Sequence, residues 1–520
     1  MGQNDELKLL NGKNRRLLQL IFSRTGIVML LMLLEIVILA GIFHFFSAYF
    51  SLFISAQYIF SIAMVLYLFN CSMESSAKIT WLFLLMLFPV PSSIMLFFVR
   101  RDPVHRAVKE RIGELIDESR SAAGDRSEIL KRDEVTDSGL DNLVEYLNRS
   151  AVSPLYGNTD VRYFESGEKK FEALLEELTK AEKFIFLEYF IISEGDMWGR
   201  ILKILADKAK TGVDVRVMYD GTCELTRLPR DYPKKLEALG IKCKVWMPPM
   251  PFVTTQYNYR DHRKILVIDG KVAFNGGINL ADEYINSGSR LGHWKDTAVM
   301  LKGDAVQSFT LMFLQMWNID EENAVFTEAE TVYMEEKHNG YVIPYGDCPL
   351  DRDHVGENVY MDILFKAKDY VHIMTPYLIL DNELENALTY AALRGIDVKI
   401  IIPGIPDKKI PYSLARTHFR ALLRAGVKLY RYTPGFVHAK VFVNDNEKAV
   451  VGSINCDYRS LYHNFECATY MYRTSCIKDI EEDFMNTLDK CSEITEESMK
   501  KDGILYKITG KVLKVFAPLM

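Results

Sequence analysis

The sequence lacks the motifs that mark most metal-dependent and cofactor-dependent enzymes. It contains no H-E-x-x-H, no paired metal-binding carboxylates, no P-loop and no glycine-rich dinucleotide fingerprint. Its eight cysteines are scattered, and no two of them have C-x-x-C spacing. This pattern favours free thiols over a disulfide framework or a zinc site. We therefore expect neither a metal ion nor a cofactor.

The chain also lacks a strong charge of either sign. Its formal net charge is -6 over 520 residues, which does not favour a polyanion such as nucleic acid as the main partner, although a local basic cleft stays open. The length is too great for one ordinary domain and suggests two or three units. Nothing in the composition sets an oligomeric state.

Charge is almost absent from three long apolar runs near the N-terminus. They cover residues 26–46, 48–69 and 79–99, and only the first holds a carboxylate, Glu35. Each run is long enough to cross a bilayer as a helix, and the region is too long and too repetitive for a cleaved signal peptide. We expect two or three transmembrane helices within residues 26–99, after a basic tail at residues 1–25.

The charges that flank these runs bear on their orientation. Basic residues lie on both sides, namely Lys8, Lys13, Arg15, Arg16 and Arg24 before the runs and Arg100, Arg101, Arg106, Lys109 and Arg111 after them. Both flanks therefore favour the cytoplasm. We expect a multi-pass membrane protein whose remaining part lies in the cytoplasm. Three full crossings would separate the two flanks, so the facing stays open. Pro89 and Pro91 predict a kink in the third run.

The remainder of the chain reads as a charged, helix-prone spacer at residues 100–150 and then a duplicated α/β unit. Both halves show a helix and an apolar strand, followed by an amphipathic helix that reaches the next strand through a glycine, Gly212 or Gly395. We place the first domain at residues 151–340, the second at 341–495, and a C-terminal amphipathic segment at 496–520.

The fourth element of each repeat carries the same motif. "HRKILVIDGKVAFNGGIN" (262–279) and "HAKVFVNDNEKAVVGSIN" (438–455) share a histidine, a lysine two residues later, an aspartate, two small residues and an asparagine. Residues two apart on a strand point to the same face. The histidine and lysine of each copy should therefore project together.

Two such faces that meet across a pseudo-two-fold axis would make one site for a phosphodiester. One neutral histidine can attack phosphorus while the other exchanges protons with the leaving and entering alcohols. We expect His262, His438, Lys264 and Lys440 to be catalytic, and Asn279, Asn455 and Ser453 to help bind the substrate. Asp269 and Asp445 either serve the histidines or only form the turns.

The duplicated H-x-K-x-x-x-x-D with its trailing G-[GS]-x-N resembles the phospholipase D superfamily. "FIFLEYFII", "HWKDTAV", "TPYLILD" and "GSINCDYRSLYHNFE" are similar to the bacterial cardiolipin synthases within it. The resemblance implies two phospholipase D-like domains. It also implies that Asp269 and Asp445 join the histidines and lysines as catalytic residues. Glu283 and Glu466 follow the two motifs and either orient the imidazoles or lie on the surface.

The resemblance further implies a reversible phosphatidyl transfer between two phosphatidylglycerols, which gives cardiolipin and glycerol through a phosphohistidine. Phosphatidylglycerol, other anionic phospholipids and the bilayer are the expected partners. The alternatives are hydrolysis, transfer to another alcohol, and an inactive lipid-binding scaffold. The C-terminal run 504–520 fits either a basic helix on an anionic surface or a helix packed on the domain.

Overall fold

The computed structural model describes residues 50–71, 73–100, 103–124, 133–136, 139–248, 259–329, 340–351, 353–500 and 504–519, with scattered residues between 33 and 49. The chain divides into an N-terminal helical unit and a larger unit that begins at Ala107. The basic tail and most of the first apolar run, including Glu35, lie outside the described residues.

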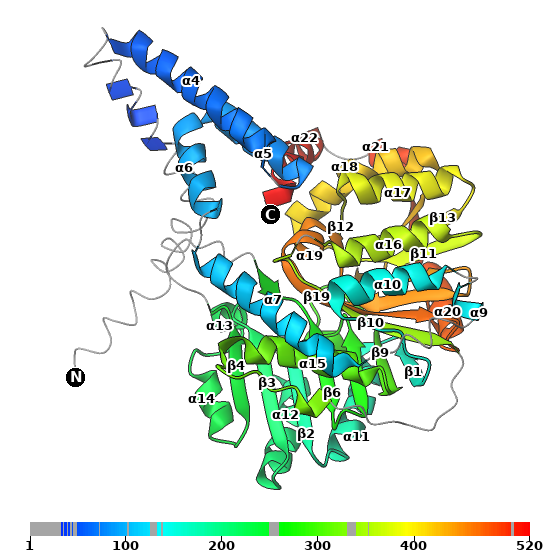
Figure 1. Cartoon of the computed structure of the whole chain (residues 1–520). Coiled ribbons are helices and arrows are strands. Elements are labelled where there is room, and N and C mark those ends of the chain that lie inside the picture. The colour runs from blue at the N-terminus through cyan, green and yellow to red at the C-terminus, as the bar shows by residue number, and fades with distance from the viewer. Residues whose placement is uncertain are drawn as a thin grey trace, which may run out of the picture. The chain divides into compact units, whose positions relative to one another are not determined.

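Three helices make up the described part of the N-terminal unit: α4 (Phe50–Phe69), α5 (Ser75–Leu87) and α6 (Pro89–Arg100) (Figure 1). The carboxylate of Glu74 caps α5 by accepting the backbone N–H groups of Ser76 and Ala77, each at 2.7 Å. The third apolar run is divided between α5 and α6, and the break lies next to Pro89, as the prolines predicted. Among the described residues, no helix combines the length and the apolar character needed to cross a membrane.

The larger unit is built on two sheets with the same strand order. The first is β1-β9-β7-β6-β2-β3-β4, and the second is β10-β19-β17-β16-β11-β13-β14 with β20 at its edge. The strands of the first sheet are β1 (Thr159–Phe164), β2 (Phe184–Tyr189), β3 (Asp214–Asp220), β4 (Lys242–Trp246), β6 (Lys264–Ile268), β7 (Val272–Gly276) and β9 (Ala298–Gly303). Those of the second are β10 (Tyr341–Asp347), β11 (Tyr370–Met374), β13 (Asp397–Pro403), β14 (Lys428–Tyr432), β16 (Val441–Asn444), β17 (Lys448–Gly452), β19 (Asn464–Tyr472) and β20 (Cys491–Ile494). The predicted duplication is confirmed strand by strand.

Helices cover both sheets. The outer face of the first sheet packs on α11 (Gly167–Thr179), α12 (Asp196–Lys210) and α14 (Tyr232–Glu237). The outer face of the second packs on α10 (Leu140–Ala151), α16 (Val355–Lys366), α17 (Asn382–Leu393) and α18 (Lys409–Ala425). Between the sheets, α15 (Val306–Trp317) and α20 (Ile477–Leu488) share one apolar core with strands of both repeats. Smaller elements are α9 (Asp133–Thr136), α13 (Cys223–Thr226), η3 (Asp282–Ile285), η4 (Asn318–Asp320), η5 (Thr327–Ala329), α19 (Tyr458–Tyr462), α21 (Glu496–Lys500) and η6 (Ala517–Leu519).

The two repeats exchange short strands around the motifs. β5 (Arg260–Asp261), just before the first motif, pairs with β19 of the second repeat. β15 (Gly435–Val437), just before the second motif, pairs with β8 (His293–Lys295) of the first. A further two-stranded sheet joins β12 (Leu378–Ile379) to β18 (Cys456–Asp457). The exchange is reciprocal, as an approximate two-fold relation between the repeats requires.

The segment expected to be a spacer is instead part of the fold. Ile112 and Leu115 on α7 (Pro103–Ala123) are at most 4% exposed, and Leu143 and Leu147 on α10 are similarly buried. These apolar residues recur at helical spacing between the charges and pack into the cores of the larger unit. The charge content of residues 100–150 hid this amphipathic pattern.

The two predicted glycine turns are confirmed. Gly212 follows α12 with φ of +94°, and Gly395 follows α17 with the same value. Only glycine adopts this left-handed conformation at no steric cost.

Candidate active site

The backbone of each motif is fixed by the other repeat. His262 precedes β6, and its N–H donates to the carbonyl of Phe465 at 2.9 Å. His438 precedes β16, and its N–H donates to the carbonyl of Lys295 at 2.7 Å. The strand exchange therefore determines where both histidines lie.

Each imidazole is also oriented by a carboxylate from the opposite repeat. Nδ1 of His262 lies 2.8 and 2.9 Å from the two carboxylate oxygens of Glu466, and Nδ1 of His438 lies 2.7 Å from Asp296 Oδ2. An ionised carboxylate accepts only, so Nδ1 carries the proton in both rings when the two carboxylates are charged. The pKa of Asp296 is lowered, because its burial is outweighed by His438 and Lys440. Burial raises the pKa of Glu466 to about 7 against the opposing effect of Lys264. Nε2 of each ring is left as the free nitrogen for chemistry.

Burial keeps both histidines neutral in the unliganded protein. It lowers the pKa of His438 to about 4, with Lys440 adding to the effect and Asp296 opposing it. The pKa of His262 is also lowered well below its usual value, first by burial and then by Lys264 and Lys440. A neutral Nε2 is the form that attacks phosphorus. A bound phosphate anion would raise both values and allow one ring to hold a proton.

The two motif lysines lie beside the histidines. The ammonium of Lys264 donates to the carbonyl of His262, and that of Lys440 donates to the carbonyl of His438. Burial lowers the pKa of Lys264 to about 8 and that of Lys440 to about 7, opposed mainly by Glu466 and Asp296 respectively. Both lysines are 1% exposed, so a bound anion would meet a desolvated positive charge.

Aromatic rings enclose the imidazoles. The ring centre of His438 lies 5.4 Å from those of Tyr284 and Trp294 and 5.9 Å from that of Phe436. The ring centre of His262 lies 4.8 Å from that of Phe190. These walls limit the access of water to the two rings.

Asp269 and Asp445 lie away from the histidines, at the far ends of β6 and β16. Asp269 accepts the backbone N–H groups of Glu182, Lys183 and Phe184 at 2.7–2.8 Å. Asp445 accepts those of Lys368, Asp369 and Tyr370 at 2.8–2.9 Å. Of the two roles left open by the sequence, these contacts support the structural one. Their carboxylates anchor the start of β2 and of β11.

The small-residue turns support the orienting carboxylates. The hydroxyl of Ser453 donates to Glu466, and it also receives the N–H of Cys467 at 3.0 Å. Gly277 occupies the matching place in the first repeat, where a Cβ atom would lie 2.2 Å from Oδ1 of Asp296. In the second repeat a serine hydroxyl therefore holds the carboxylate, whereas in the first repeat the missing side chain of Gly277 leaves room for the carboxylate itself.

The asparagines differ from each other. The amide of Asn279 accepts the N–H of Ile191 at 3.0 Å and donates to the hydroxyl of Tyr284 at 2.7 Å. It therefore holds the loop together, and one of its two N–H donors is already used by Tyr284. Asn455 is 5% exposed, and its amide oxygen has no hydrogen-bond partner among the described residues.

Of the two glutamates proposed to orient the imidazoles, only Glu466 does so. Glu283 instead forms an ion pair with Arg227 at 2.8 Å, which supports the other alternative left open for it, a carboxylate with no role at the imidazoles. Asp296 was not predicted from the sequence, and it occupies the place in the first repeat that Glu466 occupies in the second. Asp296 lies two residues before Ala298, the β9 partner of Gly276. Glu466 lies two residues before Ala468, the β19 partner of Gly452. The loop between the motif and this carboxylate is longer in the first repeat than in the second, so the two carboxylates do not align in the sequence.

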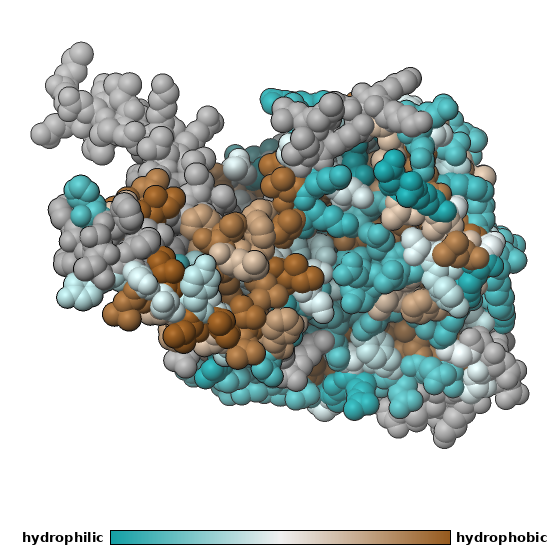
Figure 2. All heavy atoms as spheres, turned by 90° about the horizontal axis from the view of Figure 1, so that it is seen from above, coloured by the Kyte–Doolittle hydropathy of each residue, from teal (hydrophilic) through white to brown (hydrophobic). Residues whose placement is uncertain are grey.

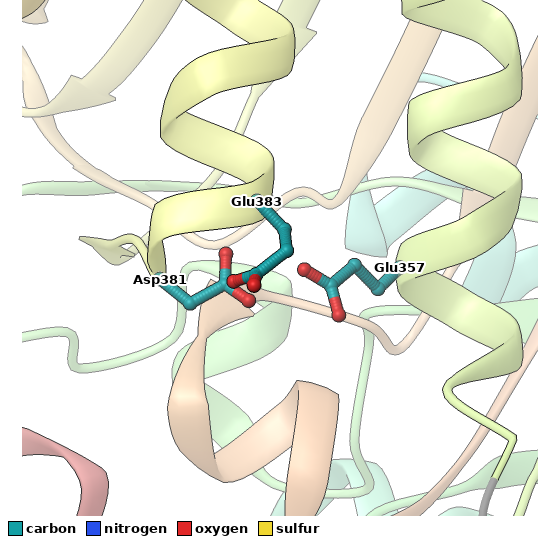
Figure 3. A group of neighbouring side chains, drawn as sticks. All are labelled: Glu357, Asp381 and Glu383. Atoms are coloured by element: carbon teal, nitrogen blue, oxygen red, sulfur yellow. The ribbon is translucent and has the colours of Figure 1, made fainter. Parts of the chain in front are cut away.

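A group of carboxylates elsewhere in the second repeat has the spacing of a metal site. Glu357, Asp381 and Glu383 have carboxylate oxygens within 4.8 Å of one another, and their side chains converge in Figure 3. The hydroxyl of Tyr462 donates to Asp381, and its oxygen lies 3.0 Å from Oε2 of Glu357, where it can accept a proton held by that carboxyl group. Burial and the neighbouring Asp381 raise the pKa of Glu357 to about 9. A proton held by Glu357 and the Tyr462 hydroxyl therefore relieve the repulsion within this group.

Comparison with known proteins agrees with the fold and the site. A family model described as "Cardiolipin synthase, PLD-like domain" matches residues 174–317 and 360–488. A cardiolipin synthase of Alkalihalophilus pseudofirmus is 33% identical over 451 residues, covering 85% of this chain and 88% of its own. One of Halalkalibacterium halodurans is 32% identical over 477 residues, covering 91% and 94%.

Two further similarities extend this comparison. A Streptococcus mutans protein described only as uncharacterized is 56% identical over 460 residues, covering 88% of this chain and all of its own. The crystal structure of a phosphatidylserine synthase from Haemophilus influenzae has the same fold, with a TM-score of 0.55 at 13% identity over 73% of this chain and 97% of that one. The family resemblance seen in the sequence is thereby confirmed, and the chain belongs to the cardiolipin synthase family of phospholipase D-like enzymes.

Proposed function

We propose that this enzyme transfers a phosphatidyl group from one phosphatidylglycerol to the glycerol hydroxyl of another and so makes cardiolipin and free glycerol. The observation that carries the proposal is the pair of histidines whose Nδ1 atoms are bound by carboxylates of the opposite repeats. This arrangement leaves two Nε2 atoms, one to attack and one to move protons, in a single site made by both halves of the chain.

The reaction takes two displacements at phosphorus. Nε2 of one histidine attacks the phosphorus of the first lipid, and the bond from phosphorus to the glycerol oxygen breaks. The other histidine, protonated, gives its proton to that oxygen, and glycerol leaves. The same ring then takes a proton from the hydroxyl of the second lipid, whose oxygen attacks phosphorus while the phosphorus–nitrogen bond breaks. One phosphodiester is exchanged for another, so no nucleotide is consumed and the transfer is reversible.

Charge develops on the phosphoryl oxygens in both steps. The ammonium groups of Lys264 and Lys440 are buried, and each donates a hydrogen bond to the backbone carbonyl of its motif histidine. They would stabilise this charge in a site with little water. Tyr284, Trp294 and Phe436 would favour a lipid hydroxyl over water as the second nucleophile.

We further propose that the N-terminal unit attaches the enzyme to the bacterial cell membrane, with the catalytic unit on the cytoplasmic side. The three apolar runs and their basic flanks support this. Apolar side chains on α4–α6 are also widely exposed, for example Tyr58 at 69%, Ile59 at 70% and Met86 at 79%. Figure 2 shows the brown side chains gathered on this unit. Such a surface needs lipid or protein to cover it.

The test is a product assay on the purified full chain in phosphatidylglycerol vesicles, without nucleotide or added metal. We expect cardiolipin and glycerol in equal amounts. Phosphatidic acid as the main product would replace the proposal with hydrolysis. Failure to form either product would remove the enzymatic proposal.

A further inference from the structure

The carboxyl ends of the strands in the second sheet carry an exposed surface that the proposed reaction does not use. β11 and β13 are parallel, and β16 runs antiparallel to β11. The segment after β13 and the start of β16 therefore lie at the same edge of the sheet. His438 precedes β16, so this edge also holds the catalytic ring. Open α/β sheets bind their ligands at this edge.

Helix α22 (Ile504–Lys514) extends this surface by packing along α18. A Cβ atom on Gly510 would lie 2.7 Å from the carbonyl oxygen of Ser413, so the two helices meet backbone to backbone. Leu513 packs with Leu414 in a small apolar cluster. The C-terminal helix is therefore docked on the catalytic unit, which was one of the two alternatives for this segment.

Exposed apolar and basic residues lie on this helix pair and in the segment just before α18. Ile405, Ile410 and Val512 are 42%, 48% and 56% exposed. Exposed lysines accompany them, namely Lys408, Lys409 and Lys511. We call these six residues the docking face. Exposed branched aliphatic side chains among lysines are the composition of a surface that enters the headgroup region of an anionic bilayer.

A small surface recess lies beside the docking face, and its walls include Lys408, Pro411, Tyr412 and Phe436. Lys408 belongs to the docking face, whereas the ring of Phe436 stacks on that of His438 with centres 5.9 Å apart. The docking face therefore lies close to the part of the chain that holds His438.

We propose that the docking face lies against the anionic phospholipid bilayer, next to the edge of the sheet that holds His438. Charge complementarity selects this occupant. The chain as a whole is acidic, at -6, whereas the docking face carries three lysines. The Asp407 carboxylate within this segment accepts the hydroxyl of Tyr377 at 2.7 Å. This inference identifies the side of the enzyme that faces the lipid bilayer. It rests on the proposed function only for what happens to the lipid after it binds.

Photo-crosslinking of the full chain in phosphatidylglycerol vesicles tests the proposal. A benzoylphenylalanine in place of Ile410 should give an adduct with phosphatidylglycerol, found by the mass of the crosslinked peptide. The matched control replaces Leu393, which is 73% exposed at the end of α17, at the opposite edge of the sheet. It should give none. A lipid adduct at 393 equal to that at 410, or no lipid adduct at 410, would overturn the proposal. An adduct with protein at 410 would do the same.

A charge arm makes the test specific. Replacement of Lys408→Glu should lower the yield of the lipid adduct at 410 about fivefold, and Lys511→Glu by a similar factor. When the three lysines are kept, replacing phosphatidylglycerol vesicles by phosphatidylcholine vesicles should also lower the yield of the lipid adduct at 410. Yields that do not depend on these charges would overturn the anionic part of the proposal. Replacement of Ile405 by the same photoreactive residue gives a second position if the 410 variant does not fold.

The crosslink does not require turnover, so the two proposals fail separately. Lipid adducts that form in a His438→Ala variant would show that the docking face contacts the bilayer even when no cardiolipin is made. Cardiolipin made by a chain that gives no adduct at 405 or 410 would instead retain the reaction and reject the docking face.

Discussion

At the scale of single residues, we expect the two carboxylates that orient the imidazoles to be needed for activity. Glu466→Gln and Asp296→Asn keep the size of each side chain but replace an acceptor-only group by an amide that can turn its NH₂ toward Nδ1. The ring would then adopt the wrong tautomer. We expect turnover to fall by on the order of 100-fold or more in each variant, measured as cardiolipin formed per folded enzyme.

Glu283→Gln is the matched control for these two variants, because Glu283 pairs with Arg227 and contacts neither imidazole. Its turnover should stay near that of the natural enzyme. A loss in Glu283→Gln as large as that in Glu466→Gln would contradict the assignment.

The buried lysines give the reaction a basic limit. The pKa is about 8 for Lys264 and about 7 for Lys440. A lysine loses its charge as the pH rises through its pKa, so the affinity for the phosphodiester anion falls above these values. We expect kcat/KM to decline on the basic side with apparent pKa values near 7 and 8, because kcat/KM reports the free enzyme. Profiles of kcat/KM in detergent micelles check this, and a flat profile up to about pH 10 would contradict it.

At the scale of elements, Asp269 and Asp445 stabilise the fold rather than the transition state. Each carboxylate accepts three backbone N–H groups at the start of a central strand. Asp269→Asn and Asp445→Asn keep a side chain that tolerates the positive φ of +53° at both positions. They weaken charge-assisted hydrogen bonds, and we expect each to cost about 1–3 kcal/mol of stability.

Thermal unfolding of the purified variants measures this cost, and the product assay measures the turnover of the fraction that remains folded. We expect a lower melting temperature with turnover retained. An unchanged melting temperature together with lost turnover would return these aspartates to a catalytic role.

The elements also show which parts of the fold the sequence could predict. The motif histidines and lysines were found because they recur in two copies, and Gly212 and Gly395 because a left-handed turn demands glycine. Asp296 was missed because a contact between repeats has no local signature. The contacts of Asp269 could not be predicted for a similar reason, because its partners lie at residues 182–184, far away in the chain. The helices α7 and α10 were predicted to belong to a spacer because charged residues are frequent over residues 100–150.

At the scale of the whole molecule, the account depends on one site shared by two repeats. The strand pairs β5–β19 and β8–β15 place His262 beside Glu466 and His438 beside Asp296. Neither repeat holds a histidine together with its own orienting carboxylate. Separate sites in the two halves are therefore not compatible with this arrangement.

The most direct test measures cardiolipin formation by His262→Ala and by His438→Ala, each alone and then mixed in equal amounts. One shared site predicts that each variant loses on the order of 1,000-fold or more in turnover, and that mixing restores nothing while the chains act as single copies. If each variant instead kept about half of the activity, as additive independent sites would, the central claim would be contradicted.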